Sequence, residues 1–282
     1  MYTGRFAPSP TGPLHMGSLI AALASWLDAR AAGGRWLVRI EDLDQPRCVA
    51  GAADDILRTL QRLGLTWDGD VTYQSARQGL YREALEKLRG QTYWCGCTRR
   101  EIADSSLGLA ADGAHIYPGT CRERPPREKR ALRVKTSSEE IRWLDRVQGA
   151  QCQVLERDTG DFVLYRADGL FAYQLAVVVD DGAQGITDVV RGADLLDSTP
   201  RQIYLQKLLG LRTPRYLHVP VAVNATGEKL SKHSGALPIE PGMQSLRKAL
   251  AFLAQPPAES LDEAVRQWRP ALIPRLRASV LS

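Results

Sequence analysis

Two short stretches carry the side chains best suited to phosphate chemistry. The first, FAPSPTGPLHMGS at 6–18, is a stiff loop with one histidine, His15, and it leads into an apolar segment. If that segment is a helix, free backbone N–H groups and the positive end of its dipole would face bound phosphates. The second, GEKLSKHSG at 227–235, offers Lys229 and Lys232 as a cationic clamp for a triphosphate. Each stretch taken alone is more often a structural turn or a solvated surface loop than a phosphate site.

A second set of residues suits the recognition of a small zwitterion. Arg5 and Arg191 are candidate partners for carboxylates, because a guanidinium group can bind a carboxylate with two parallel hydrogen bonds. Glu41 can pair with an ammonium group, and the hydroxyl of Tyr173 can complete such a pocket. The alternative is that Arg191 and Glu41 form structural ion pairs.

Cysteines gather in a third place. Cys95, Cys97 and Cys121 supply three thiolates, and zinc prefers four tetrahedral ligands that are mostly sulfur and nitrogen. Tyr117 or His115 could provide the fourth ligand. The alternative is a set of free thiols, which is how we interpret the isolated cysteines at positions 48 and 152.

Alternating strands and helices must position these residues. Strands are predicted at 2–7 and 35–42, and helices at 17–32, 56–63 and 80–88, an order typical of a parallel α/β sheet. Beyond the middle of the chain, the apolar run FAYQLAVVVDD predicts a central strand at 171–181. We further expect strands at 187–192 and 216–224, a helix over 198–210 capped by Ser198 or Thr199, and C-terminal helices with a capping box at Ser260 and Glu263.

Between these periodic parts, residues 93–165 contain the cysteines, a polar loop and the basic run RERPPREKR. They predict an insertion and not a continuation of the sheet, and the basic run could contact phosphates. Four segments are expected: half of a catalytic domain at 1–92, an inserted subdomain at 93–170, the second half at 171–226, and a loop with C-terminal helices at 227–282.

Composition narrows the class of protein. The chain has 282 residues, of which 44% are hydrophobic and 24% charged, as in globular proteins. We expect no membrane association, because no apolar run reaches about 18 residues. The chain start lacks the pattern of a signal peptide, and five cysteines are an odd number, so we expect a cytoplasmic protein. A pI of about 9.0 allows an anionic partner.

The two phosphate-type stretches, taken together, resemble a known family. RFAPSPTGPLHMGS resembles the HIGH signature and KLSKH the KMSKS signature of class I aminoacyl-tRNA synthetases. Between them, VRIEDLDQPR, VVVDD and VVRGADLLDSTPRQIYL resemble glutamyl-tRNA synthetases in particular, as does GEKLSK. The resemblance spans about residues 3–235. It implies a Rossmann-type parallel sheet with an inserted, zinc-containing, acceptor-binding-like subdomain and a short helical C-terminal region.

The resemblance also implies activity and residue roles. Glutamate would attack ATP, held with Mg²⁺, to give glutamyl-adenylate, and an arginine at 191 favours glutamate over glutamine. It makes His15, Lys229 and Lys232 catalytic. It assigns ATP binding to His15, Gly17, Ser18, Lys229, Ser231 and Lys232. It assigns glutamate binding to Arg5, Phe6, Ala7, Pro8, Ser9, Glu41, Tyr173 and Arg191.

The chain departs from full glutamyl-tRNA synthetases in two places. Only 50 residues follow Lys232, too few for an anticodon-binding domain, and Val177 stands where the full enzymes usually show asparagine. Both departures resemble a truncated branch that attaches glutamate to the queuosine base of tRNA(Asp). That branch shares the Cys-x-Cys and Tyr-x-x-x-Cys pattern, which favours Tyr117 over His115 in one structural Zn²⁺ site per chain.

Three hypotheses therefore follow. The favoured one is a monomeric ligase with ATP, L-glutamate and queuosine-bearing tRNA(Asp) as partners. The second is a minimal glutamyl-tRNA synthetase that charges the 3′ end of tRNA(Glu). The third is a catalytically silent tRNA-binding paralogue, against which the presence of His15, Lys229 and Lys232 counts.

Overall fold

The first half of the fold is a parallel three-stranded sheet in the order β1–β2–β3. The computed structural model describes residues 1–224, 226–227 and 239–281. The elements of this half are β1 (Thr3–Phe6), α1 (Met16–Ala31), β2 (Arg35–Ile40), α2 (Ala52–Arg62), β3 (Thr72–Tyr73) and α3 (Gln78–Lys87). The predicted alternation of strand and helix is confirmed here, including the helix that follows the first loop.

A second sheet, in the order β7–β6–β10–β9, forms the other half. Its elements and the helices around it are β6 (Glu140–Asp145), β7 (Gly149–Val154), α7 (Tyr173–Ala183), β9 (Asp188–Gly192), α8 (Thr199–Leu208) and β10 (Arg215–Val219). β10 runs parallel to both β9 and β6, whereas β6 and β7 form an antiparallel hairpin. The prediction that 93–165 does not continue the sheet is therefore wrong for this hairpin.

Two other secondary-structure predictions are corrected. Residues 171–181 do not form a central strand, because Tyr173–Ala183 is helix α7. Its apolar run is buried on almost every side, and such a run has no periodicity that separates a helix from a strand. The strand predicted at 216–224 is interrupted at Pro220 and continues as β11 (Val221–Val223), which pairs with an unpredicted strand, β12 (Ala278–Val280).

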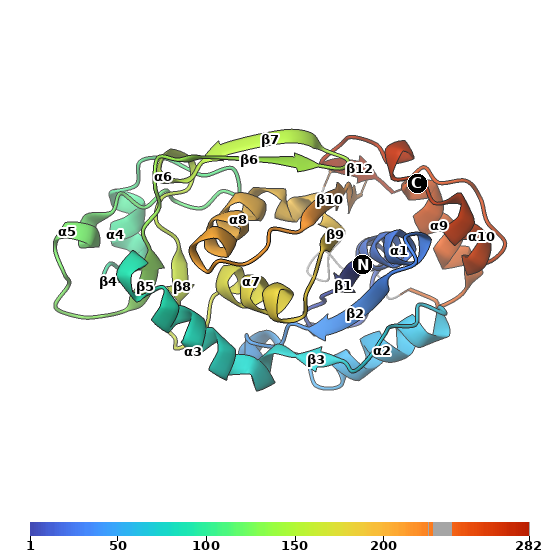
Figure 1. The fold of residues 1–282 in the computed structure, drawn as a ribbon, viewed down its shortest axis with the longest axis horizontal. Helices are drawn as coiled ribbons and strands as arrows, with labels where there is room; N and C mark the ends of the chain where they lie inside the picture. Colours follow the sequence, from blue (N-terminus) through green and yellow to red (C-terminus); the bar gives the residue numbers. More distant parts are fainter. Residues whose placement is uncertain (225, 228–238, 282) are drawn as a thin grey trace.

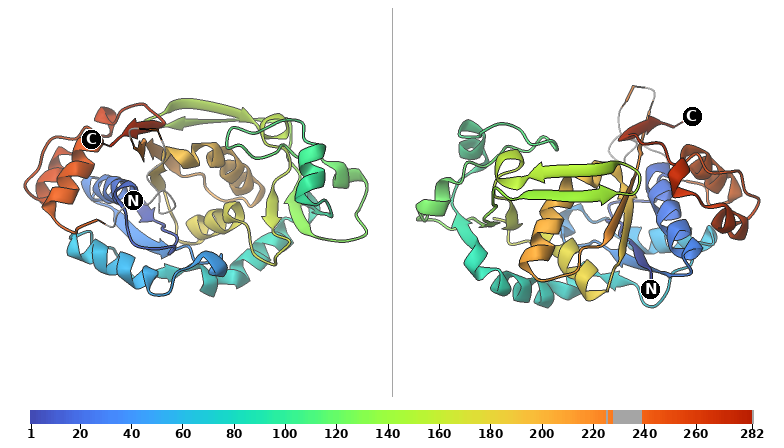
Figure 2. Two further views of the ribbon diagram at one scale, coloured as in Figure 1. Left: turned by 180° about the vertical axis from the view of Figure 1, so that it is seen from behind. Right: turned by 45° about the horizontal axis from the view of Figure 1, so that its top comes forward.

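The rest of the 93–170 segment lies at one end of the molecule (Figure 1). It contains a separate antiparallel sheet with three short helices: β4 (Thr92–Cys95), α4 (Arg99–Asp104), α5 (Thr120–Glu123), β5 (Ala131–Val134), α6 (Leu155–Asp158) and β8 (Val163–Tyr165). Both views in Figure 2 place the C-terminal helices, α9 (Met243–Phe252) and α10 (Leu261–Gln267), at the opposite end.

The main hydrophobic core surrounds α1. This helix contacts β1, β2 and β9 on one side and α9 and α10 on the other, which explains why its sequence is apolar nearly all round. Ser260 caps α10 by accepting from the backbone N–H of Glu263. The predicted capping box is only half formed, because the Glu263 carboxylate accepts from the backbone N–H of Glu259 and not from that of Ser260. Ser198 precedes α8 without capping it, and its hydroxyl instead accepts a hydrogen bond from Gln174. No helix in the described part of the chain is long and apolar enough to cross a membrane.

Candidate active site

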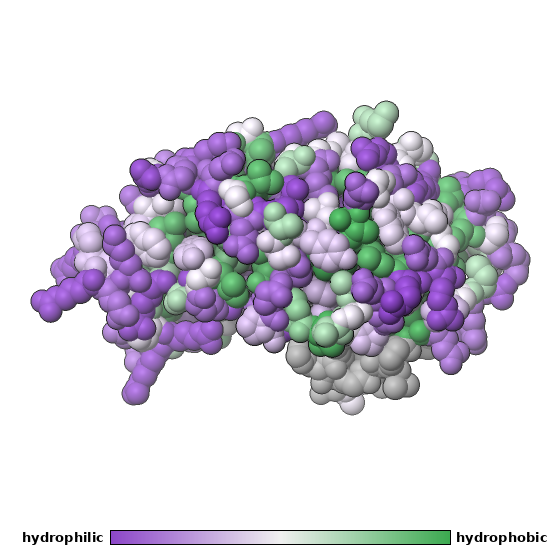
Figure 3. Space-filling view, turned by 90° about the horizontal axis from the view of Figure 1, so that it is seen from below, coloured by the Kyte–Doolittle hydropathy of each residue, from purple (hydrophilic) through white to green (hydrophobic). Residues whose placement is uncertain are grey.

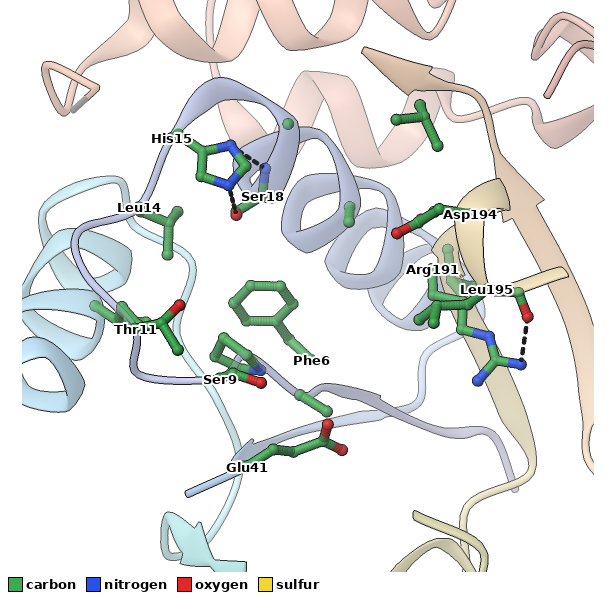
Figure 4. Close-up of a pocket in the computed structure, with 18 of the residues that line it drawn as sticks. Phe6, Ser9, Thr11, Leu14, His15, Ser18, Glu41, Arg191, Asp194 and Leu195 are labelled. Atoms are coloured by element: carbon green, nitrogen blue, oxygen red, sulfur yellow. Dashed lines mark hydrogen bonds between the residues drawn. The ribbon is translucent and has the colours of Figure 1, made fainter. Parts of the chain in front are cut away.

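A pocket of about 450 Å³ opens between the two sheets, next to the N-terminal end of α1. It is lined by the end of β1 and the loop after it, the start of α1, the residue after β2, the start of α7, and the end of β9 (Figure 4). All of the described residues assigned above to glutamate or ATP line it, namely Arg5, Phe6, Ala7, Pro8, Ser9, His15, Gly17, Ser18, Glu41, Tyr173 and Arg191. Lys229, Ser231 and Lys232 lie outside the described residues.

His15 stands at the N-terminus of α1, at one end of the pocket. Its Nδ1 accepts a hydrogen bond from the backbone N–H of Ser18 at 3.4 Å, so it caps the helix. Because Nδ1 is an acceptor, the ring proton lies on Nε2, which donates to the hydroxyl of Ser18 at 3.0 Å. Figure 4 shows both side chains at the rim of the pocket. The N-terminus of a buried helix of 16 residues, with the Nε2–H donor of its capping histidine beside it, suits an anionic phosphate group.

Buried ion pairs form the floor of the pocket. Arg5 binds Asp181 through Nε at 3.1 Å and Nη2 at 3.4 Å. Arg39, which is completely buried, donates from Nη1 to the same carboxylate at 2.8 Å and from Nη2 to Glu41 at 3.3 Å. Asp180 in turn accepts from Arg77 and Tyr81. These pairs join β1 and β2 to the C-terminal end of α7.

The buried negative charge of Glu41 is only partly balanced by the arginines around it. Burial raises the pKa of Glu41, and Arg39 and Arg5 offset this effect only partly. A cation in the pocket would stabilise the ionised form of this side chain. Burial also raises the pKa of the Tyr173 hydroxyl, which is therefore a neutral hydrogen-bonding group at pH 7. Both observations suit the binding of a substrate ammonium group between them.

Arg191 forms the wall opposite Glu41 (Figure 4). Its Nη2 donates to the hydroxyl of Thr199 at 2.9 Å and to the carbonyl of Leu195 at 3.3 Å, and its guanidinium group lies 5.7 Å from the ring centre of Tyr216. Its Nη1 is buried and has no hydrogen-bond partner among the described residues. The sequence suggests that Arg191 binds a carboxylate through two parallel hydrogen bonds from different nitrogens. The structure does not allow this, because both unused N–H groups of Arg191 are on Nη1.

His218 and Asp145 complete this wall, and neither was singled out from the sequence. The Nε of Arg191 donates to Nε2 of His218 at 3.0 Å. An arginine cannot accept a hydrogen bond, so Nε2 carries no proton and Nδ1 donates to Asp145 Oδ2 at 2.5 Å. Burial and the charge of Arg191 lower the pKa of His218 to about 4, although Asp145 opposes the shift. The imidazole is therefore neutral at pH 7.

The cysteine pattern folds into a compact cluster near the far end of the inserted segment. The three Sγ atoms of Cys95, Cys97 and Cys121 lie within 4.8 Å of one another. The hydroxyl of Tyr117 is 3.4 Å from Cys95 Sγ and 3.6 Å from Cys97 Sγ. Zn–S bonds of about 2.3 Å at tetrahedral angles separate ligand atoms by roughly 3.8 Å, so the spacing fits a four-coordinate ion. The exposed side chain of His115 is not among the described members of this cluster.

Comparison with known proteins places the chain in a family. Residues 2–241 match the model of the catalytic domain of class I tRNA synthetases (E and Q). The chain therefore belongs to the class I aminoacyl-tRNA synthetases that include the glutamate and glutamine enzymes. This membership agrees with the α/β architecture and its parallel sheets.

Comparison with individual relatives points to a particular branch of this family. The chain is 59% identical to a glutamyl-Q tRNA(Asp) synthetase from Dechloromonas aromatica (92% of this chain, 88% of the relative) and 58% identical to one from Cupriavidus metallidurans (98% and 93%). It resembles the crystal structure of a glutamate-tRNA synthetase from Elizabethkingia anophelis with a TM-score of 0.83 and 25% identity. That match covers all of this chain and 68% of the other.

The His218–Asp145 pair predicts a specific loss of stability in acid. In the unfolded chain His218 takes up a proton near pH 6.5, whereas the folded protein takes it up only near pH 4. Lowering the pH from 7 to 4 should therefore remove about 3 kcal/mol of stability through this group. The free energy of unfolding, measured in urea at pH 7 and pH 4, should fall less in His218→Gln than in the wild type. Equal falls would contradict the assignment of a neutral, buried imidazole.

Proposed function

We propose that this protein activates L-glutamate with ATP and transfers the glutamyl group to the queuosine base in the anticodon loop of tRNA(Asp). The observation that carries the proposal is that three features line the same pocket. They are the N-terminus of α1, capped by His15, the guanidinium group of Arg191, and the carboxylate of Glu41. Such a pocket offers separate sites for phosphate, for a side-chain carboxylate and for an ammonium group. The glutamyl-Q tRNA(Asp) synthetases at 58–59% identity support the same acceptor.

The first step is an in-line substitution at phosphorus. An oxygen of the α-carboxylate of glutamate bonds to the α-phosphorus of ATP while the bond to the bridging oxygen of the β-phosphate breaks. The products are glutamyl-adenylate and pyrophosphate, whose negative charge Mg²⁺ bound with ATP would help to neutralise. In the second step a nucleophile of the queuosine base attacks the activated carbonyl and AMP leaves. The protein contributes mainly orientation and charge stabilisation.

Each side of the pocket has a distinct task in this scheme. The N-terminus of α1 binds the phosphate oxygens as negative charge builds up, and the Nε2–H of His15 exchanges its bond to the Ser18 hydroxyl for one to a phosphate oxygen. Glu41 and Tyr173 hold the ammonium group, and Arg191 Nη1 donates to the γ-carboxylate. Arg5, held by Asp181, keeps the pocket electrostatically suited to a carboxylate. Lys229, Ser231 and Lys232 are proposed to bind the pyrophosphate.

The cysteine cluster is proposed as a structural Zn²⁺ site with Tyr117 as the fourth ligand. Arg133 lies 4.1 Å from the centre of the Tyr117 ring. Burial raises the pKa of the Tyr117 hydroxyl, and a bound Zn²⁺ would lower it and favour the phenolate. Bound zinc would hold β4 and α5 together at the end of the inserted subdomain. We propose this subdomain at 93–170, between catalytic halves at 1–92 and 171–226 and before the C-terminal part at 227–282, in a cytoplasmic monomer.

The inserted subdomain also offers a surface for tRNA. Figure 3 keeps the left–right placement of Figure 1, and it shows mostly hydrophilic side chains over the end that carries this segment. Within the basic run, Arg122 is bound to Asp161 and Arg130 to Glu128. Arg124 and Arg127 are exposed and have no ion pair among the described residues. These two arginines are therefore the best placed to contact phosphates.

The acceptor is tested with tRNA from queuosine-producing cells, half of it trimmed of its terminal CCA. Incubated with ATP, Mg²⁺ and labelled glutamate, the protein should label intact and trimmed tRNA alike, because the acceptor base lies inside the molecule. Label in the intact pool alone would mean 3′-end charging. Label in neither pool would support a tRNA-binding paralogue without catalysis.

The metal proposal predicts one zinc per chain in protein purified from zinc-supplemented cells, measured by elemental analysis. Cys121→Ser should lose most of this zinc, and Tyr117→Phe should lower its retention during dialysis against a chelator, because each change removes a ligand. His115→Ala is the matched control and should retain the wild-type content. Loss of zinc from His115→Ala with full retention in Tyr117→Phe would reverse the ligand assignment.

The tRNA surface is tested by removing two charges at each end of the molecule. Arg124→Ala/Arg127→Ala should weaken tRNA binding and lower the slope of log Kd against log salt by roughly 1 to 2, because about two phosphate contacts are lost. Lys248→Ala/Arg266→Ala removes the same charge from exposed positions on α9 and α10. An equal effect of the two double variants would show a general charge effect and not a contact.

A further inference from the structure

Three buried side chains stand in line behind the pocket wall. Asp145 at the end of β6, His218 in β10 and Arg191 in β9 are exposed by no more than 5%. The line runs from Asp145 Oδ2 through both ring nitrogens of His218 to Arg191 Nε, with separations of 2.5 and 3.0 Å. Arg191 is the only one of the three that lines the pocket.

We propose that His218, with its proton held on Nδ1 by Asp145, is a positioning residue that fixes Arg191 for the side-chain carboxylate of glutamate. This inference rests on the proposed function, since it gives the glutamate site its specificity. His218 never reaches the substrate. It supplies the acceptor for Nε, and together with Thr199 and Leu195, which accept from Nη2, it leaves Nη1 for the ligand.

The donor count of Arg191 supports this role. Of its five N–H groups, the one on Nε is bound to His218 and the two on Nη2 have acceptors at Thr199 and Leu195. The two on Nη1 have no partner among the described residues and are buried. Figure 4 shows this nitrogen directed toward the side of the pocket where Glu41 lies. A buried donor without an acceptor is costly, and a carboxylate bound there removes the cost.

The same count of donors on Arg191 predicts that the site discriminates against glutamine. An amide offers one oxygen, and its NH₂ group would face donors that cannot accept. Glutamine pays the full cost of these unpaired donors only if the guanidinium group cannot rotate and present a different edge to the ligand. The bonds to His218, Thr199 and Leu195, together with the face of Tyr216 5.7 Å away, oppose that rotation.

Asp145 fixes the proton of His218 by a geometry that a single substitution can reverse. Its Oδ1 accepts from the backbone N–H groups of Val147, Gln148 and His218 at 3.0, 2.8 and 3.2 Å, and only Oδ2 faces the imidazole. In Asp145→Asn the three backbone donors must keep the amide oxygen at the Oδ1 position. The amide NH₂ then donates to Nδ1, the ring proton moves to Nε2, and two donors meet at Arg191.

Asp145→Asn therefore tests the proposal with little change in shape. Glutamate-dependent ATP–pyrophosphate exchange should show a KM for glutamate raised about tenfold or more, with the KM for ATP nearly unchanged. The ratio of kcat/KM for glutamate to that for glutamine should fall about tenfold. His218→Leu should behave alike, whereas His218→Gln, whose amide oxygen can accept from Arg191, should recover most of the affinity for glutamate.

A variant that only destabilises the protein serves as the control. Tyr204→Phe removes a buried hydrogen bond to the carbonyl of Lys135, at 2.8 Å, without touching the pocket. It should lower the melting temperature without changing the glutamate KM or the selectivity ratio. If Asp145→Asn and His218→Leu also leave both quantities unchanged, His218 has a purely structural role and the proposal is overturned.

The position of the proton is measured without any substrate. The ¹⁵N shifts of the histidine side chains at pH 7 should show a protonated Nδ1 and a bare Nε2 for His218, and the reverse in Asp145→Asn. A proton on Nε2 in the wild type overturns the positioning role. A wild type with the expected proton but no glutamate-dependent exchange would instead overturn the proposed function, and with it the ligand given to Arg191.

Discussion

The pairing of buried arginines with two adjacent aspartates of α7 is the interaction on which the rest of the structure depends. Asp181 binds Arg5 from β1 and Arg39 from β2, while Asp180 binds Arg77 before α3. Burial of any one of these charges without its partner would cost several kcal/mol. The helix must therefore end against the first sheet, and this position brings the start of α7, with Tyr173, to the pocket.

The same need to balance buried charge shapes the ligand site. The carboxylate of Glu41 is only partly balanced by positive charge, and Nη1 of Arg191 has no acceptor among the described residues. The two groups have opposite charge. A zwitterionic ligand with an additional carboxylate satisfies both, whereas a neutral side chain leaves the arginine donor unpaired. Selectivity in such a site arises from what the protein leaves unpaired, because the unfilled donor penalises the wrong ligand more than any contact rewards the right one.

Much of the site could be predicted from the sequence because its motifs are local. The loop after β1 and the start of α1 lie within one continuous stretch, so their residue types and order are enough to predict a phosphate site, and they do line one pocket. The pair His218 and Asp145 could not be found in this way, since 73 residues separate them and each lies in an ordinary strand pattern. The sequence predicts a strand where helix α7 lies, because burial on almost every side removes the polar face by which a helix is recognised. Val177, which stands where full glutamyl-tRNA synthetases usually show asparagine, is buried on this helix and does not line the pocket.

The turn between β6 and β7 connects the inserted segment to both halves of the catalytic pocket. Asp145 holds His218 in the pocket wall, Gln148 donates to the carbonyl of the same histidine, and Arg146 binds Asp28 of α1 at 2.5 Å. Asp28 also accepts from Trp268 at the end of α10, which ties the C-terminal helices to the same point. Successive residues of one tight turn thus reach a strand and the central helix, so the inserted segment cannot shift without moving the group that orients Arg191. The segment that we propose as the tRNA-contacting surface is therefore also tied structurally to the proposed amino-acid site.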